Sequence, residues 1–146
     1  MSVSYEADYY AWTVEQVTLL RQGRLNDADI AHIAEELEDL GKAEKRELRN
    51  RLAVLLAHLL KWQAQPGGRG ASWQATIREQ RLRLADHLAD DPSLRPTVSD
   101  VVAQVWPRAV VVAMGQTKLA EELFPTSCPW SAEQVIDAAF WPGGEG

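Results

Sequence analysis

The sequence predicts an all-α protein, a compact bundle of about five to six helices around a long central helix. Apolar residues recur three and four positions apart along almost all of the 146-residue chain, which is the spacing of one helical face. Glycine and proline fall mainly between these periodic segments, where turns are expected. The valine-rich stretch 98–114 is the best candidate for a strand, and no other segment offers it a convincing partner.

The first two expected helices have clear start and stop signals. The apolar stripe of the first consists of Tyr10, Val14, Val17 and Leu20. Asp8 is its expected N-cap, and Gly23 can end it in a left-handed conformation. The apolar stripe of the second consists of Ile30, Ile33, Leu37 and Leu40. Asp27 or Asp29 can cap this second helix, and Gly41 is its expected stop.

The longest helical pattern runs from Lys42 to Gln65 and is the expected central helix. Its segment 52–60 is apolar nearly all round, as a buried helix would be. Pro66-Gly67-Gly68 breaks the pattern, and Ser72 is the expected cap of a helix that continues to residue 89. Because the connecting loop is short, we expect these two helices to pack antiparallel.

The C-terminal third is predicted to be helical as well. We interpret 98–114 as a helix in which Pro107 is a kink or a first-turn residue. Residues 117–124 are expected to add one or two turns. Ser131 and Gln134 fit a capping box, which predicts a last short helix ending near Trp141.

Length and composition suit a single helical domain. Residues 1–146 are expected to form it, with loose ends at 1–4 and 143–146. The chain has no run of 18 apolar residues, so we expect no membrane span. Its N-terminus shows no secretory signal, so we expect a cytoplasmic protein.

The charge is distributed in blocks. The chain has 15 Lys and Arg against 21 Asp and Glu, and this net charge of −6 argues against a mainly nucleic-acid-binding surface. Residues 1–41 carry −7, residues 42–83 carry +7 and residues 84–146 carry −6. These blocks favour electrostatic self-complementarity, either within one bundle or between two subunits. A patch for an anion or a nucleic acid on the basic segment is the alternative.

Five motifs, in order along the chain, carry a resemblance to a known family. They are Tyr5-Glu6-x-Asp8-x-Tyr10-Ala11-Trp12-Thr13, Glu35-Glu36-Leu37-Glu38-x-Leu40-Gly41, Leu55-Leu56-x-His58-Leu59-Leu60-Lys61-Trp62-Gln63, Ser72-Trp73-x-x-Thr76-Ile77-x-x-Gln80-Arg81 and Phe124-Pro125-x-x-Cys128-Pro129. Through them, about residues 5–142 resemble the bacterial domain-of-unknown-function family twenty-nine. The resemblance implies a compact all-helical domain from a bacterium. It implies no activity, catalytic residue or cofactor.

The residues that could carry metal or cysteine chemistry form no complete set. Asp29, His32 and Glu36 share one helical face, but helical di-iron sites need a second half-site that the sequence lacks. Cys128 is the only cysteine, and no signature of a cysteine hydrolase surrounds it. The Gly67–Gly70 loop lacks the lysine and the preceding strand of a P-loop. No catalytic residue, metal site or cofactor is therefore predicted, and the sequence leans away from an enzyme.

One polar cluster is predicted where the central helix meets the next one. We expect the side chains of His58, Gln63, Thr76 and Gln80 to lie together, walled by aromatic residues. The candidate binding residues are His58, Trp62, Gln63, Trp73, Thr76, Gln80 and Arg81. A hydrogen-bonded core network that fixes helix register is favoured, because buried polar groups need partners. The alternative is a pocket for a small ligand or for catalysis.

The leading functional hypothesis is a non-enzymatic protein-interaction module, possibly a homodimer. The blocked charge, the lack of a catalytic set and the six tryptophans favour it, since aromatic residues are enriched at interfaces. The partner is then another protein or a second copy. One alternative is a nucleic-acid-binding module that uses the basic hairpin 42–83. The other is an enzyme with a small polar pocket near His58 and Gln80.

Overall fold

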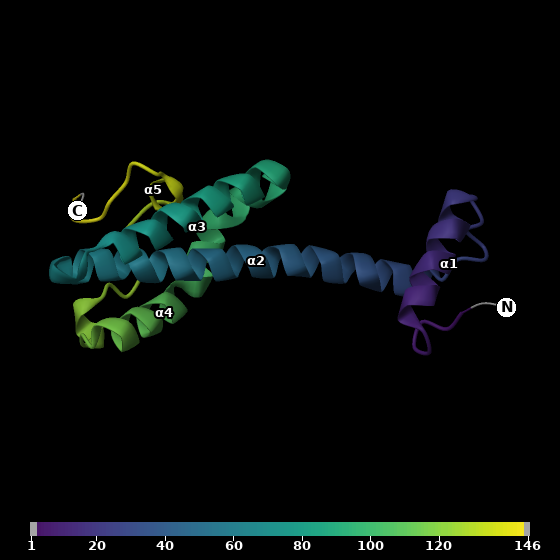
Figure 1. The fold of residues 1–146 in the computed structure, drawn as a ribbon, viewed down its shortest axis with the longest axis horizontal. Coiled ribbons are helices and arrows are strands. Elements are labelled where there is room, and N and C mark those ends of the chain that lie inside the picture. The colour runs from purple at the N-terminus through teal and green to yellow at the C-terminus, as the bar shows by residue number, and fades with distance from the viewer. Residues whose placement is uncertain (1–2, 145–146) are drawn as a thin grey trace. The chain divides into compact units, whose positions relative to one another are not determined.

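The computed structural model describes residues 3–144 and contains no strand within them, so the all-α prediction is confirmed (Figure 1). Its α-helices are α1 (Tyr9–Arg21), α2 (Ile30–Ala64), α3 (Ala71–Asp90), α4 (Val98–Thr117) and α5 (Ala132–Ile136). Short 3-10 turns lie at Pro66–Gly68, Pro92–Thr97 and Glu121–Leu123. The chain divides into two compact units, Met1–Glu44 and Lys45–Gly146, and we describe each by itself.

Gly41 does not end a helix, so the two helices predicted on either side of it are one. Helix α2 runs for 35 residues through this position. Glycine in a helix interior costs only about 1 kcal/mol relative to alanine, which good helix formers on both sides offset. Leu40, Lys42 and Ala43 are such residues. A glycine therefore stops a helix only where the chain also turns away.

In the N-terminal unit, both caps of α1 are confirmed. The Asp8 carboxylate accepts a hydrogen bond from the Ala11 backbone N–H at 3.0 Å. Gly23 has a φ of +72°. Its N–H donates to the Leu20 carbonyl, and the Arg24 N–H donates to the Leu19 carbonyl. These two bonds form a Schellman motif, which satisfies carbonyls at the end of the helix.

The apolar stripe of α1 does not face the core of its unit. Helix α1 buries the opposite face, which consists of Trp12, Gln16 and Leu19. The indole N–H of Trp12 donates to the Asp29 carboxylate at 3.0 Å, and the side-chain carbonyl of Gln16 accepts from the Asp29 N–H at 2.7 Å. These polar contacts fix which face of α1 turns inward. The stripe from Tyr10 to Leu20 is consequently exposed.

In the C-terminal unit, the second half of α2 lies between α3 and α4 (Figure 1). Leu52, Leu55, Leu56 and Leu59 are fully buried there. The Lys61 ammonium lies 4.9 Å from the centre of the Trp73 ring, and His87 Nε2 lies 3.9 Å from a carboxylate oxygen of Glu47. Late residues of α2 thus meet early residues of α3, which confirms the antiparallel hairpin. Gly70 rather than Ser72 is the N-cap of α3.

The helical interpretation of 98–114 is confirmed, because α4 contains Pro107 without a break. Beyond α4, residues 121–123 form only one 3-10 turn. The capping box of Ser131 and Gln134 is present as predicted. Helix α5 nevertheless ends at Ile136, well before Trp141. The physical reason is that Arg81 donates to the carbonyls of Gln134 and Val135, which a longer helix would use itself.

Candidate functional site

The structure does not join the four polar side chains of the predicted cluster through hydrogen bonds. His58 Nδ1 donates to the Val54 carbonyl at 2.9 Å, and the Thr76 hydroxyl donates to the Ser72 carbonyl at 3.1 Å, so both bonds stay within one helix. Gln63 is exposed. The side-chain carbonyl of Gln80 is buried and has no hydrogen-bond partner in the part of the chain that the structure describes. Burial lowers the pKa of His58, which favours the neutral ring.

Two other predicted binding residues hold the C-terminal segment against the α2–α3 hairpin. The Trp62 indole N–H donates to the Gly144 carbonyl at 3.1 Å. Arg81 donates to the carbonyls of Phe140 at 2.7 Å, Val135 at 3.0 Å and Gln134 at 3.4 Å. The Arg81 side chain is buried. Its guanidinium is therefore occupied by backbone carbonyls of the C-terminal segment.

Arg69 strengthens the same attachment, a role that the sequence does not predict, since there Arg69 is one of the basic residues of the alternative anion or nucleic-acid patch. Its guanidinium donates to the Trp62 carbonyl at 2.7 Å and to the Pro142 carbonyl at 3.5 Å. The available signal was a glycine-rich loop that carries one arginine between two tryptophans. The partner carbonyl is more than 70 residues away, however, and no local pattern indicates it.

Lys61 is a buried cation at the end of the same hairpin. Its ammonium donates to the Gln116 side-chain carbonyl at 2.5 Å and lies over the Trp73 ring. Burial lowers its pKa. Trp73 is half-buried, and the face of its indole ring contacts the Lys61 ammonium in a cation–π interaction.

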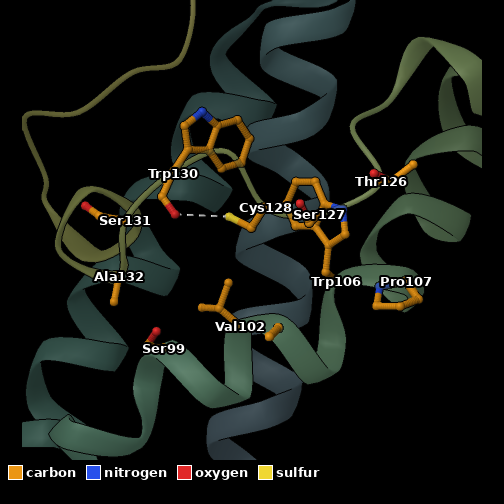
Figure 2. Close-up of a pocket in the computed structure, with 11 residues that line it drawn as sticks. Ser99, Val102, Trp106, Pro107, Thr126, Ser127, Cys128, Trp130, Ser131 and Ala132 are labelled. Atoms are coloured by element: carbon orange, nitrogen blue, oxygen red, sulfur yellow. Dashed lines mark hydrogen bonds between the residues drawn. The ribbon is translucent and has the colours of Figure 1, made fainter.

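A pocket of about 280 Å³ lies between α4 and the segment 126–132 (Figure 2). Val102 and Cys128 both line it, and the rings of Trp106 and Trp130 meet edge to face with centroids 5.7 Å apart. The Cys128 thiol donates to the Trp130 carbonyl at 3.4 Å, and burial raises its pKa. A thiol with a raised pKa is a poor nucleophile at neutral pH. Cys128 therefore acts as a packing residue of this pocket.

In the N-terminal unit, Asp29, His32 and Glu36 share a helical face but already have hydrogen-bond partners within the protein. The hydroxyls of Tyr5 and Tyr9 both donate to the Glu36 carboxylate, which lowers the pKa of Glu36. His32 Nδ1 donates to the Asp29 carboxylate at 2.7 Å. This bond raises the pKa of His32 and lowers that of Asp29. The network ties residues before α1 to the start of α2.

The N-terminal unit also carries a large set of exposed apolar side chains, which we call the apolar surface. Nine large hydrophobic residues here are each 40% or more exposed. They are Tyr9, Tyr10, Val14, Val17, Leu20, Leu25, Ile30, Leu37 and Leu40. Single exposed apolar residues are ordinary, but only five other large hydrophobics are exposed in the rest of the described chain, so nine within about 30 residues is a marked concentration. The apolar surface is the candidate functional site.

Comparisons with known proteins identify the family but no activity. A family model described as "Domain of unknown function DUF29" matches residues 4–141. No curated protein and no solved structure matches the chain. Among the described residues, no helix is long and apolar enough to cross a membrane. Because the family model covers nearly the whole sequence, the chain belongs to the DUF29 family of domains of unknown function.

Proposed function

We propose that the protein is a non-enzymatic interaction module that associates with a second copy of itself through the apolar surface. The observation that carries this proposal is the exposure of nine large apolar side chains in α1, the following loop and the first turns of α2. Leu37 and Leu40 are 63% and 65% exposed, and Tyr10 is 78% exposed. Burying such side chains stabilises a complex by about 25 cal/mol for each Å² of apolar surface.

The charge pattern supports a second copy as the partner. Residues 1–41 carry −7 and residues 42–83 carry +7, so each copy offers both signs. With a two-fold axis, the acidic segment of each copy can meet the basic segment of the other twice, as a self-complementary interface requires.

The nucleic-acid alternative has less support. It requires the basic side chains of 42–83 to be exposed together. Arg81 and Lys61 are buried, Arg51 pairs with Glu47, and Arg83 pairs with Glu79 at 2.7 Å. Residues 42–83 contain ten Lys and Arg, and fewer than ten of these side chains are therefore left to bind phosphates.

Light scattering coupled to size-exclusion chromatography tests the proposal with matched variants. We expect the wild-type chain to elute as a dimer, and the Leu37→Ser/Leu40→Ser variant to elute as a monomer with an unchanged circular-dichroism spectrum. Val111→Ser is the control, because Val111 is 66% exposed on α4, outside the apolar surface. It should remain dimeric. A wild-type monomer, or equal loss of the dimer in the control, would contradict the proposal.

A further inference from the structure

A continuous groove runs along one face of α4, in the C-terminal unit and outside the apolar surface. Besides the pocket of about 280 Å³ described above, a second pocket of about 460 Å³ lies further along this helix. Trp106, Pro107 and Thr126 line both pockets, so the two adjoin. We propose that this groove binds an extended peptide segment of a partner protein, one that carries apolar side chains and an arginine or a lysine.

The α4 residues that line the groove form a single helical stripe, because they recur three and four positions apart. They are Ser99, Val102, Ala103, Trp106, Pro107, Val110 and Val111. Residues of the segment 121–132 form the facing wall, and Figure 2 shows the part of this wall that belongs to the first pocket. From Ser99 to Val111 the helix rises by about 18 Å. An extended chain rises about 3.3 Å per residue, so a segment of about five or six residues fits this length.

The floor of the groove is apolar and is already formed in the free protein. The buried side chains of Trp106 and Phe124 line the second pocket, and Val111, which also lines it, is 66% exposed. The removal of apolar surface from water is the main favourable contribution to most protein association. The Trp106 indole N–H donates to the Pro125 carbonyl at 2.9 Å and so ties the two walls together. A peptide therefore does not have to open the groove before it binds.

The charged groups of the groove favour a basic side chain in the peptide. Glu121 and Glu122 line the second pocket, and no described Lys or Arg lines either pocket. Neither carboxylate has a hydrogen-bond or ion-pair partner within residues 3–144. A guanidinium or an ammonium group supplies the positive charge and the N–H donors that these two carboxylates lack.

A backbone group of α4 adds an acceptor for the peptide main chain. Pro107 lies inside α4 and has no N–H, so it cannot donate to the Ala103 carbonyl as an ordinary residue four positions further on would. Ala103 lines the groove. Its carbonyl therefore lacks its helical donor at a place where a peptide N–H can supply one. Acceptors for a backbone N–H and for a basic side chain thus lie in the same groove, which favours a peptide over a simple amine.

An NMR titration of the full chain with the capped peptide Arg-Thr-Leu-Thr-Leu-Thr-Arg tests the proposal. In an extended peptide its Arg and Leu side chains share one face, and its symmetric sequence brings an arginine to the glutamates in either chain direction. We expect saturable binding with a Kd below about 1 mM, seen as shifts of the indole N–H signals of Trp106 and Trp130. The same peptide with Glu in place of both Arg should bind at least roughly tenfold more weakly.

Two variants of the protein locate the site. Glu121→Gln/Glu122→Gln should weaken binding roughly threefold or more, because the arginine loses its charged partners. Asp86→Asn/Asp90→Asn is the matched control, since it removes the same charge from exposed positions on α3, and it should bind like the wild type. Ala103→Phe should abolish binding by filling the groove. Ala103 is exposed, and circular dichroism checks that the variant is folded.

Three results would overturn the proposal: no shift of the two indole signals at about 1 mM peptide, equal binding of the Glu-containing peptide, or unchanged affinity in both groove variants. The Leu37→Ser/Leu40→Ser variant separates the groove from the apolar surface. It should bind the peptide like the wild type, whatever its oligomeric state. Loss of binding in this variant would place the peptide on the apolar surface and would contradict the groove as the site.

Discussion

Replacing Arg81 by methionine should detach the C-terminal segment from the α2–α3 hairpin. Methionine keeps most of the aliphatic length but removes three donors, of which two make bonds of 2.7 and 3.0 Å. A hydrogen bond from a charged donor contributes about 1.5–3 kcal/mol, so two strong bonds contribute about 3–6 kcal/mol. Removing a buried charge recovers part of this, because the guanidinium no longer has to be desolvated. We expect a net loss of about 2–4 kcal/mol in the free energy of unfolding.

Urea unfolding followed by tryptophan fluorescence measures this loss. Trp62 and Trp141 contact each other at 4.7 Å and report on the same attachment. Arg78→Met is the matched control, because Arg78 is exposed on the same helix. It should change stability by less than about 0.5 kcal/mol. A loss below about 1 kcal/mol in the Arg81 variant would refute the anchoring role.

Three further changes have predicted outcomes. Gly41→Ala should stabilise the protein by about 0.5–1 kcal/mol in thermal unfolding, because the site is helical and a Cβ there meets nothing within 4 Å. Ser131→Ala should destabilise α5 by about 1 kcal/mol, seen as faster amide exchange at Gln134. The raised pKa of His32 means that its protonated form is favoured by folding. The stabilisation that protonated His32 gives the folded protein is therefore complete at pH values below the pKa of His32 in the unfolded chain. It is lost as the pH rises through the raised pKa of His32 in the folded protein. An NMR titration should find the raised pKa of His32 in the wild type and a lower one in Asp29→Asn, because the bond to Asp29 is the main cause of the shift.

Helix positions follow from local signals, and this is why the sequence predicts them well. Asp8, Gly23 and Ser131 act on backbone groups within a few residues, so their patterns can be recognised without tertiary structure. The prediction that Gly41 ends a helix was wrong, because glycine also occurs inside helices. The merged helix α2 shows that a stop signal needs a reason for the chain to turn.

The orientation of helices and the roles of buried polar residues depend on distant partners. The apolar stripe of α1 predicts a buried face, yet the contacts of Trp12 and Gln16 with Asp29 turn that face outward. Arg81 was proposed to bind a ligand, and its partners are carbonyls 53 to 59 residues away. A periodic pattern cannot distinguish an interface from a core. The sequence therefore reveals the apolar stripes of this segment, but it does not indicate that they are exposed.

Sedimentation equilibrium of the wild-type chain tests the central proposal most directly. At roughly tens of micromolar, self-association through the apolar surface predicts twice the chain mass of 16.3 kDa. The dimer should dissociate on dilution and weaken at high salt, because opposite charges flank the apolar side chains. A strict 16.3-kDa monomer over this concentration range would contradict the proposed function.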